Sequence, residues 1–234
     1  MSNSLPHSYH AVLLDLDGTF ADTALDFIGV VNQMRQEHKL PVLADSLIRQ
    51  RVSHGSSALT TLATALEPTH PAFDQHKTRF LDRYEISNGQ HTRLFPGMAD
   101  TLAWLAKHHI PWGIVTNKPI RFTTPLLHAL NLTHPAQLVV CPDHVEKAKP
   151  HPDALFLGAE QLDIPASHCI YVGDHERDII AGKSAGMLTI AALYGYIDQD
   201  EQPDQWNYDV AVHDSQQLLP LLQSLLTPHR RTPP

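Results

Sequence analysis

Two kinds of hydrophobic pattern alternate along the chain: short apolar runs, and stretches in which hydrophobic residues recur every three or four positions. The first run, AVLLDLD at 11–17, is apolar until it ends in acids, and it predicts a buried parallel strand that opens into a loop. From Ala24 to about Ser87 the hydrophobic residues follow the i, i+3, i+4, i+7 spacing of a helix face. They include Phe27, Val30, Val31 and Met34, and later Leu59, Leu62, Ala63 and Leu66. This block therefore predicts helices and no strand.

After LFPGM at 94–98 the two patterns alternate regularly. The expected helices are 98–108, 120–130, 152–162, 176–185 and 214–226. The expected strands are 111–116, 137–141, 168–173, 187–192 and 208–212. Such alternation predicts an α/β fold, a mostly parallel sheet covered by helices, with the earlier block inserted after the first strand. We expect a catalytic core of 1–22 and 89–228, a helical cap of 23–88 and a flexible tail of 229–234.

Composition narrows the classes of function. The 234 residues are 42% hydrophobic and 18% charged, which is typical of a globular protein, and the formal charge of -8 argues against binding to nucleic acid or anionic lipid. Two separated cysteines form no disulfide framework, and no run is long enough to span a membrane, so we expect a cytoplasmic protein. The 17 histidines are scattered without the spacing of a zinc site.

Open parallel sheets bind ligands at the carboxyl ends of their strands, and the first strand ends in two closely spaced acids. Asp15 and Asp17 lie two residues apart, and Gly18 permits a tight turn after them. Two carboxylates this close repel each other, so a cation between them is favourable, and Mg²⁺ suits oxygen ligands that share coordination with a phosphate. An isolated DxDG would be explained equally well by a simple turn.

Three later strand or loop ends also carry suitable chemistry. Thr116 and Asn117 lie where a strand turns into a helix and can donate to a phosphate, although Thr116 alone would pass for a helix cap. Lys147 and Lys149 precede a helix, and either could offset phosphate charge or simply be solvated. Asp174 and Asp178 share one face of a first helical turn, where acids are common for dipole reasons. Together the four segments provide a nucleophile, phosphate donors, a cation and metal ligands.

The ordered strings DLDGT at 15–19, VTNKP at 115–119, AKPHP at 148–152 and VGDHERDI at 172–179 resemble the haloacid dehalogenase superfamily over essentially the whole chain. The resemblance implies a Rossmann-like core with a helical cap and a phosphatase that depends on Mg²⁺. It makes Asp15 the nucleophile and Asp17 the general acid and base. Thr116 and Lys149 would hold the phosphoryl group, and Lys149 is preferred to Lys147 because it directly precedes Pro150. The metal would be held by the Asp15 side chain, the Asp17 carbonyl and Asp174.

The resemblance also implies that Asp178 supports the waters of the metal or the lysine. Within the superfamily, the strings DGTxxDT, LFPGMADTL and VTNKP resemble the phosphoglycolate phosphatase branch. NKPIRF, VVCPDHV and YGYI resemble the subgroup that hydrolyses N-acetylmuramic acid 6-phosphate in peptidoglycan recycling. The cap string LIRQRVSHG at 47–55 fits the same subgroup and suggests substrate contacts. Arg49 and His54 could equally be solvated residues of the cap. The candidates are Arg49, His54, Gly55 and Ser56, beside Thr116, Asn117 and Lys149 in the core.

Other activities remain open at this point. A dehalogenase has no need of an acid at the position of Asp17, so the presence of Asp17 argues against that activity. A sugar phosphomutase and a non-catalytic regulatory member of the fold stay as alternatives. We expect a small phosphorylated substrate and a monomer or homodimer, and 2-phosphoglycolate is the second candidate substrate. The cap is also expected to open and close on hinges at about 20–24 and 88–96.

Overall fold

The computed structural model describes residues 8–226 and contains a six-stranded sheet in which every neighbouring pair is parallel. The strand order is β5-β4-β1-β6-β7-β8. The strands are β1 (Ala11–Leu14), β4 (Trp112–Val115), β5 (Leu138–Val140), β6 (Cys169–Gly173), β7 (Leu188–Ala192) and β8 (Val210–Val212). The predicted α/β fold with a parallel sheet is therefore confirmed. The expected tail of 229–234 lies outside the described residues.

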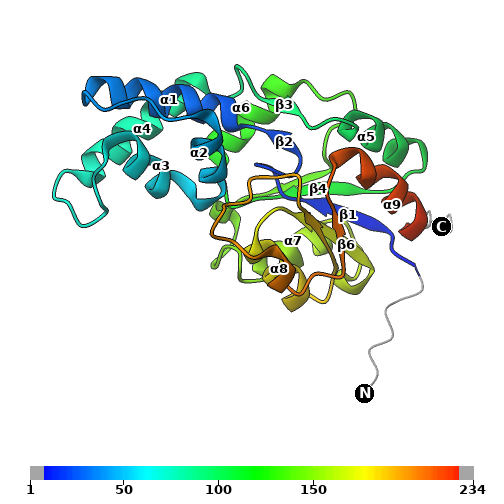
Figure 1. Cartoon of the computed structure of the whole chain (residues 1–234). Coiled ribbons are helices and arrows are strands. Elements are labelled where there is room, and N and C mark those ends of the chain that lie inside the picture. Colours follow the sequence, from blue (N-terminus) through cyan, green and yellow to red (C-terminus); the bar gives the residue numbers. More distant parts are fainter. Residues whose placement is uncertain (1–7, 227–234) are drawn as a thin grey trace.

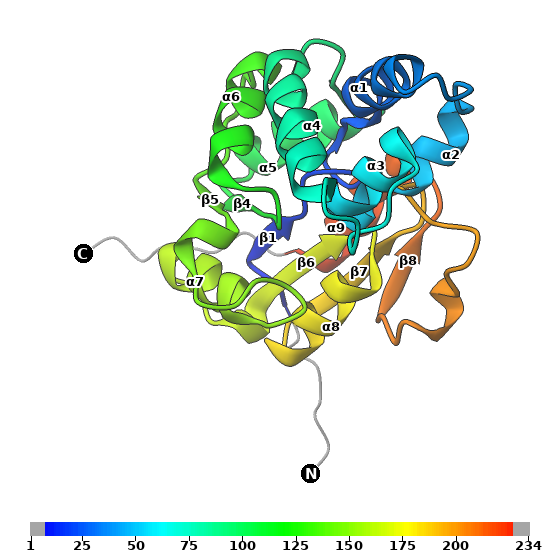
Figure 2. The same ribbon diagram turned by 90° about the vertical axis from the view of Figure 1, so that its left-hand side faces the viewer.

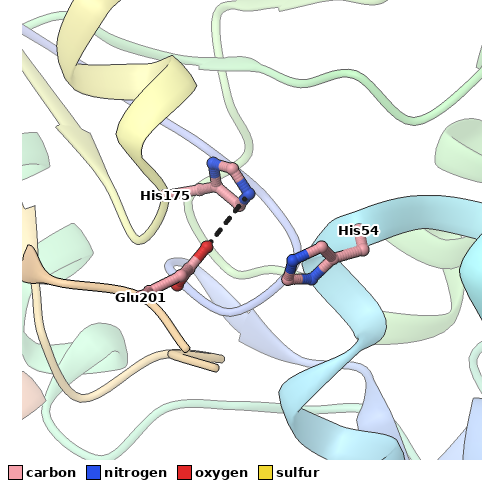
Figure 3. Close-up of side chains that lie close together, drawn as sticks. All are labelled: His54, His175 and Glu201. Carbon is pink, nitrogen blue, oxygen red and sulfur yellow. Dashed lines mark ion pairs between the residues drawn. The ribbon is translucent and has the colours of Figure 1, made fainter. Parts of the chain in front are cut away.

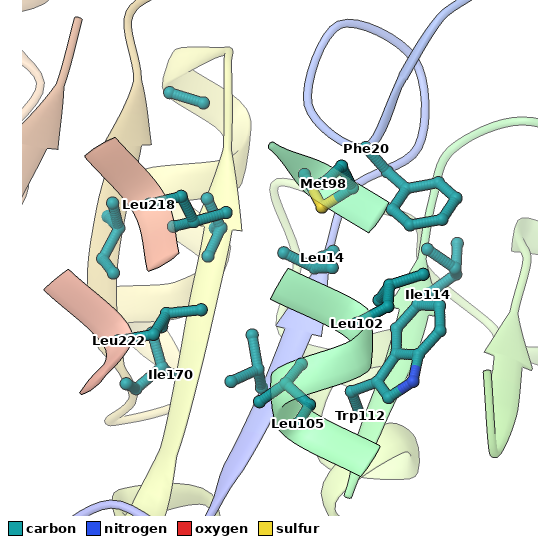
Figure 4. Close-up of a cluster of buried hydrophobic side chains, with 14 of the residues drawn as sticks. Leu14, Phe20, Met98, Leu102, Leu105, Trp112, Ile114, Ile170, Leu218 and Leu222 are labelled. Carbon is teal, nitrogen blue, oxygen red and sulfur yellow. The ribbon is translucent and has the colours of Figure 1, made fainter. Parts of the chain in front are cut away.

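Helices cover both faces of the sheet (Figures 1 and 2). One face packs against α5 (Met98–Lys107), α6 (Ile120–Leu130) and α9 (Leu218–Leu225), and the other against α7 (Asp153–Gln161) and α8 (Glu176–Ser184). Side chains of β1 alternate between the two cores, because successive residues of a strand point to opposite faces. Val12 and Leu14 join the first core, which Figure 4 shows around α5 and α9, and Leu13 joins the second.

The helical block forms a layer of its own beside the carboxyl ends of the strands (Figure 1). Its helices are α1 (Ala24–Glu37), α2 (Asp45–Gln50), α3 (Gly55–Thr64) and α4 (Phe73–Ser87), with a 3-10 turn η1 (Val52–His54) before α3. Helix α1 packs against the other three, and the rings of Phe27 and Tyr84 stack with centroids 4.0 Å apart. We refer to residues 24–87 as the cap and to the sheet with its helices as the core.

The chain crosses between core and cap twice. A short two-stranded ribbon, which the hydrophobic pattern did not predict, joins these two passages. Strand β2 (Ala21–Asp22) pairs antiparallel with β3 (Arg93–Leu94). Close to it, the buried carboxylate of Asp26 accepts hydrogen bonds from the backbone N–H groups of Gly89 and His91, at 2.8 Å each, and from the Thr92 hydroxyl at 2.7 Å. Two-residue strands have no detectable periodicity, which is why sequence pattern misses them. The passages are thus held side by side.

The carboxyl-terminal part of the core differs slightly from expectation. The helix predicted at 214–226 begins as a 3-10 turn, η5 (Ser215–Gln217), and continues as α9. Further 3-10 turns are η2 (Pro142–His144), η3 (Ala166–His168) and η4 (Pro203–Gln205). Just before β8, the Asp209 carboxylate accepts from the backbone N–H and hydroxyl of Thr189, at 2.8 and 2.9 Å, and pairs with Lys183. This contact fastens the edge strand to β7.

Two further expectations can be compared with the described residues. Among residues 8–226, no helix combines the length and the apolar character that crossing a bilayer requires. Both cysteines, Cys141 and Cys169, are buried free thiols.

Candidate active site

The central strands bring three predicted site residues to one edge of the sheet. Strand β1 pairs with both β4 and β6, so the residues that follow these strands, Asp15, Thr116 and Asp174, lie side by side. All three are buried. Lys149 reaches the same point from the loop before α7, and its ammonium group lies 2.9 Å from Asp15 Oδ1. Residues from four separate segments therefore meet at this edge.

Lys149 is the buried cation of this cluster. Its Nζ lies 2.7 Å from Asp178 Oδ1, 2.7 Å from the Tyr171 hydroxyl and 3.0 Å from the carbonyl oxygen of Val115. Burial alone would lower the pKa of the ammonium group, but the adjacent carboxylates of Asp15 and Asp178 raise it by more, so the pKa lies above its usual value. Lys149 is therefore charged at neutral pH. Asp178 thus contacts the lysine, and its role in supporting the lysine or the waters of the metal stays a prediction.

The carboxylates outnumber this cation. Oxygen atoms of Asp15, Asp174 and Asp178 lie within 4.8 Å of one another. Burial raises the pKa of Asp15, against the opposing effect of Lys149. Burial also raises the pKa of Asp174 well above its usual range, and the charges of Asp15 and Asp178 add to this. A hard divalent cation would relieve this repulsion, and the all-oxygen donor set is the kind such cations prefer. The donors present thus fit a divalent metal.

Asp174 is held in place from several directions. Its Oδ2 accepts from the backbone N–H of Tyr196 at 2.9 Å and from the hydroxyl of Ser53, a cap residue, at 3.2 Å, and its Oδ1 accepts from the Thr19 hydroxyl at 3.3 Å. Gly18 has φ +82°, and a Cβ there would lie 2.0 Å from Asp174 Oδ2. Only glycine fits this close approach, which the sequence had attributed simply to a tight turn.

Asp17 is not part of this cluster and is held by Thr23, which directly precedes the cap, and by Lys118 of the core. Its Oδ1 accepts from the hydroxyl of Thr23 at 2.6 Å and from Lys118 Nζ at 3.0 Å. The Lys118 ammonium group is almost fully buried and lies 4.9 and 4.8 Å from the ring centroids of Phe27 and Tyr84 on the cap. Cation–π attraction and the ion pair together fix Lys118 beside Asp17.

A cavity of about 290 Å³ opens beside these groups between core and cap. Asp15, Asp17, Thr116 and Asn117 line it from the core. From the cap it is lined by Phe27, Val52, Ser53, Gly55, Ser56, Leu59, Leu81 and Tyr84, and the remaining lining residues are Lys118, Pro119, Arg121, Phe122 and Arg177. The cavity is therefore charged at the sheet edge and largely apolar on the cap side.

The sequence-predicted substrate contacts divide into two groups. Gly55, Ser56, Thr116 and Asn117 line the cavity, and the Asn117 side chain also ties the neighbouring loop, accepting from Lys149 N at 3.1 Å and donating to the Lys149 carbonyl oxygen at 2.8 Å. Arg49 instead pairs with Asp22 at 2.6 Å, and Arg49, His54 and the buried Lys149 do not line the cavity.

His54 belongs to a contact between cap and core that Figure 3 shows. It lies near His175 and Glu201, and the three offer ligand atoms within 4.8 Å of one another. However, His175 Nδ1 accepts the backbone N–H of Arg177, which leaves the ring proton on Nε2, 3.3 Å from Glu201 Oε1. Burial lowers the pKa of His175 to about 3, so the ring is neutral. The protonated Nε2 has no lone pair for a metal, so these three residues form a polar contact between cap and core.

Comparison with known proteins identifies the family to which the chain belongs. A family model described as haloacid dehalogenase-like hydrolase matches residues 12–192. The chain belongs to this family. Its members are hydrolases, and the matched region includes all four segments that meet at the sheet edge.

Relatives in this family are phosphatases. An N-acetylmuramic acid 6-phosphate phosphatase of Pseudomonas putida is 41% identical over 216 residues, covering 92% of this chain and 97% of the relative. A phosphoglycolate phosphatase of Xanthomonas campestris is 39% identical over 208 residues, covering 89% and 94%. A crystal structure described as a predicted phosphoglycolate phosphatase of Haemophilus somnus has 25% identity and a TM-score of 0.79, covering 92% and 98%. The similarity thus includes both core and cap.

Several residues of the site were not singled out from the sequence of this haloacid dehalogenase-like hydrolase. Lys118 lies within VTNKP and Arg177 within VGDHERDI, so both were inside recognised strings, yet nothing in the strings shows that they line the cavity. Tyr171 lies among core residues in β6, so the sequence predicts only a packing role for it. The structure shows that its hydroxyl lies beside Lys149. Ser53 lies within the cap string LIRQRVSHG that suggested substrate contacts, but its contact with Asp174 depends on how the cap lies on the core, which the string does not show.

Proposed function

We propose that this protein is a Mg²⁺-dependent phosphomonoesterase that hydrolyses N-acetylmuramic acid 6-phosphate in peptidoglycan recycling, in the cytoplasm. The observation that carries the proposal is the buried contact of Asp15 with Lys149, next to Asp174, beside a cavity between core and cap that Asp15 and Thr116 line. The 41% identity to a phosphatase of that name supports the choice of substrate.

In the proposed reaction, a carboxylate oxygen of Asp15 attacks the phosphorus, and the bond from phosphorus to the ester oxygen breaks. Asp17 gives a proton to the departing alkoxide, and an aspartyl-phosphate remains on Asp15. Water then attacks the phosphorus and loses its proton to Asp17, which releases inorganic phosphate and restores the Asp15 carboxylate. Two phosphoryl transfers replace one difficult hydrolysis, and both depend mainly on positioning and charge stabilisation.

Thr116 and Lys149 support the phosphoryl group in this scheme, because a hydroxyl and an ammonium group at this edge can hold its oxygens. Asp15, the carbonyl of Asp17 and Asp174 would hold the metal. When bound, Mg²⁺ neutralises charge on the phosphate and on the crowded carboxylates. Before substrate arrives, Lys118 Nζ lies 3.0 Å from Asp17 Oδ1. A phosphate that attracts Lys118 would free Asp17 to carry the proton.

2-Phosphoglycolate is the second candidate substrate, because the Xanthomonas campestris relative bears that activity in its name. The cavity of about 290 Å³ has a long apolar wall from the cap, including Phe27, Leu59 and Tyr84. A two-carbon acid would leave most of this wall in contact with water, whereas a sugar ring would cover it. The cavity therefore favours the sugar phosphate.

The test is phosphate release in Mg²⁺ from N-acetylmuramic acid 6-phosphate, 2-phosphoglycolate and several sugar phosphates, compared by kcat/KM. Asp15→Asn is the control: it keeps the shape of the side chain, and we expect it to lose turnover while its circular dichroism stays that of the wild type. Substantial residual turnover in this variant would contradict the nucleophile assignment.

The outcomes separate the remaining candidates. A preference for 2-phosphoglycolate would replace the substrate proposal and keep the phosphatase. Transfer of phosphate between positions of a sugar, without net release, would indicate a phosphomutase. Absence of turnover of every ester in Mg²⁺ would favour a non-catalytic regulatory protein.

A further inference from the structure

We infer that Arg121 binds a carboxylate of the substrate, and that the pocket thereby selects phosphate esters that carry a second acid. This inference rests on the proposed phosphatase function and assigns a residue to the recognition of the leaving group. Arg121 lies in the first turn of α6 and lines the same cavity as Asp15 and Thr116.

Three cations line the cavity, and two of them already have partners. Lys118 is paired with Asp17 and packed between two aromatic rings. Arg177 donates to the carbonyl oxygen of Ser53 and is close enough to Asp15 and Asp174 to lower the pKa of both, against the larger effect of burial. Arg177 therefore serves the end of the cavity where the phosphate reacts.

Arg121 differs from both. No hydrogen bond or ion pair joins it to any residue within 8–226, and its one recorded contact is with the ring of Phe122, whose centroid is 4.4 Å from the guanidinium carbon. Phe122 in turn lies 5.4 Å, centroid to centroid, from Tyr84 of the cap. Arg121 is exposed, so its guanidinium group lies over the Phe122 ring and stays open to solvent and to a ligand in the cavity. A planar guanidinium fork matches a carboxylate with two parallel hydrogen bonds.

The charge balance of the cavity supports the same ligand. The lining carries three cations, Lys118, Arg121 and Arg177, and two acids, Asp15 and Asp17, so one positive charge is in excess. Arg121 is the lining cation that has neither an acid nor a carbonyl partner among residues 8–226. The two kinds of relative act on N-acetylmuramic acid 6-phosphate and on phosphoglycolate, and each of these names a compound with a carboxylate as well as a phosphate. N-acetylglucosamine 6-phosphate, which lacks the lactic acid ether of muramic acid, would leave Arg121 without a partner.

This pair of sugars provides the experiment, because they differ only in the lactic acid ether that carries the carboxylate. The measured quantity is the ratio of kcat/KM for N-acetylmuramic acid 6-phosphate to that for N-acetylglucosamine 6-phosphate. We expect Arg121→Ala to lower the ratio by about 10- to 100-fold, as loss of a charge-assisted hydrogen-bonded pair would. Arg121→Lys keeps the charge without the fork and should give an intermediate ratio. Lys107→Ala, which removes an exposed cation at the end of α5, is the matched control.

A second readout does not depend on turnover. Binding of the two sugar phosphates to Asp15→Asn in Mg²⁺, measured by calorimetry, should lose its preference for the acid when Arg121→Ala is added. If the wild type hydrolysed neither sugar, the proposed function would be contradicted. The ratio of the two binding constants would still test whether Arg121 binds the carboxylate. A ratio within twofold of the parent protein in both measurements, or equal losses for both sugars, would overturn the assignment of Arg121.

Discussion

Replacement of Lys149 by methionine tests whether the buried ion pairs at the sheet edge stabilise the fold as well as the reaction. Methionine has nearly the length and volume of lysine, so the substitution removes the charge and its hydrogen bonds without opening a large cavity. Lys149 Nζ lies 2.9 Å from Asp15 and 2.7 Å from Asp178, and both carboxylates are buried. The variant therefore leaves two buried carboxylates without their cation.

The expected cost follows from what those carboxylates can do. Removing one partner of a buried ion pair typically costs about 3–5 kcal/mol. A carboxyl can escape by taking up a proton, which at pH 7 costs about 4 kcal/mol for an ordinary aspartate pKa, so the loss cannot greatly exceed that figure. At about 2–4 °C per kcal/mol for a chain of this size, the melting temperature should fall by about 6–16 °C.

Thermal unfolding followed by circular dichroism, in the presence of a chelator, gives the measurement. Lys147→Met is the matched control, because Lys147 is exposed in the same loop and its loss should change Tm by less than about 2 °C. The double variant Lys149→Met with Asp178→Asn removes one of the stranded charges, so it should be more stable than Lys149→Met alone.

Two results would refute this reasoning. A Lys149→Met protein that melts within 2 °C of the wild type would mean that the carboxylates are not stranded. A double variant that is less stable than Lys149→Met would mean that hydrogen bonding by Asp178, rather than its charge, dominates.

Three other expectations follow from particular contacts. Gly18→Ala and Gly186→Ala both place a side chain at positive φ, at +82° and +73°, which alone costs about 1–2 kcal/mol of stability. Gly18→Ala should lose more than this, because its Cβ also strikes Asp174 and Tyr196. Only at Gly18 does the new Cβ strike the Asp174 carboxylate, so only that variant should lose phosphatase activity, and equal activities would contradict the assigned crowding. Burial raises the pKa of Asp209, but hydrogen bonds from Lys183 and Thr189 lower it by more, to below its usual 3.8. Its stabilising effect is therefore fully present above that value and is lost as the pH falls below it. Urea unfolding should separate Asp209→Asn from the wild type at pH 7, and the difference should shrink as the pH falls below 3.8; a constant difference would contradict this. Spin labels at the exposed residues Leu47 on the cap and Phe156 on the core should give a shorter or narrower distance distribution with a phosphate analogue bound, and unchanged distances would argue against cap closure.

Local pattern in the sequence determined most of the secondary structure and the chemistry of the sheet edge. The run at 11–17 and the later alternation predicted the strands and helices of the core to within a few residues, because periodicity of two kinds reports burial directly. Parallel strands place all their carboxyl ends at one edge. Asp15, Thr116 and Asp174 could therefore be grouped before any coordinates were known.

Tertiary structure alone decided how the cap meets that edge. The contacts of Ser53 with Asp174 and of Lys118 with the cap rings depend on the docking of one unit on another, and no periodicity records it. The same docking turns His54 toward Glu201 and places Arg121 in the cavity wall. The sequence thus determined which groups can hold phosphate and metal, since backbone pattern places them. The side chains around the rest of the substrate were decided by packing between residues far apart in the chain.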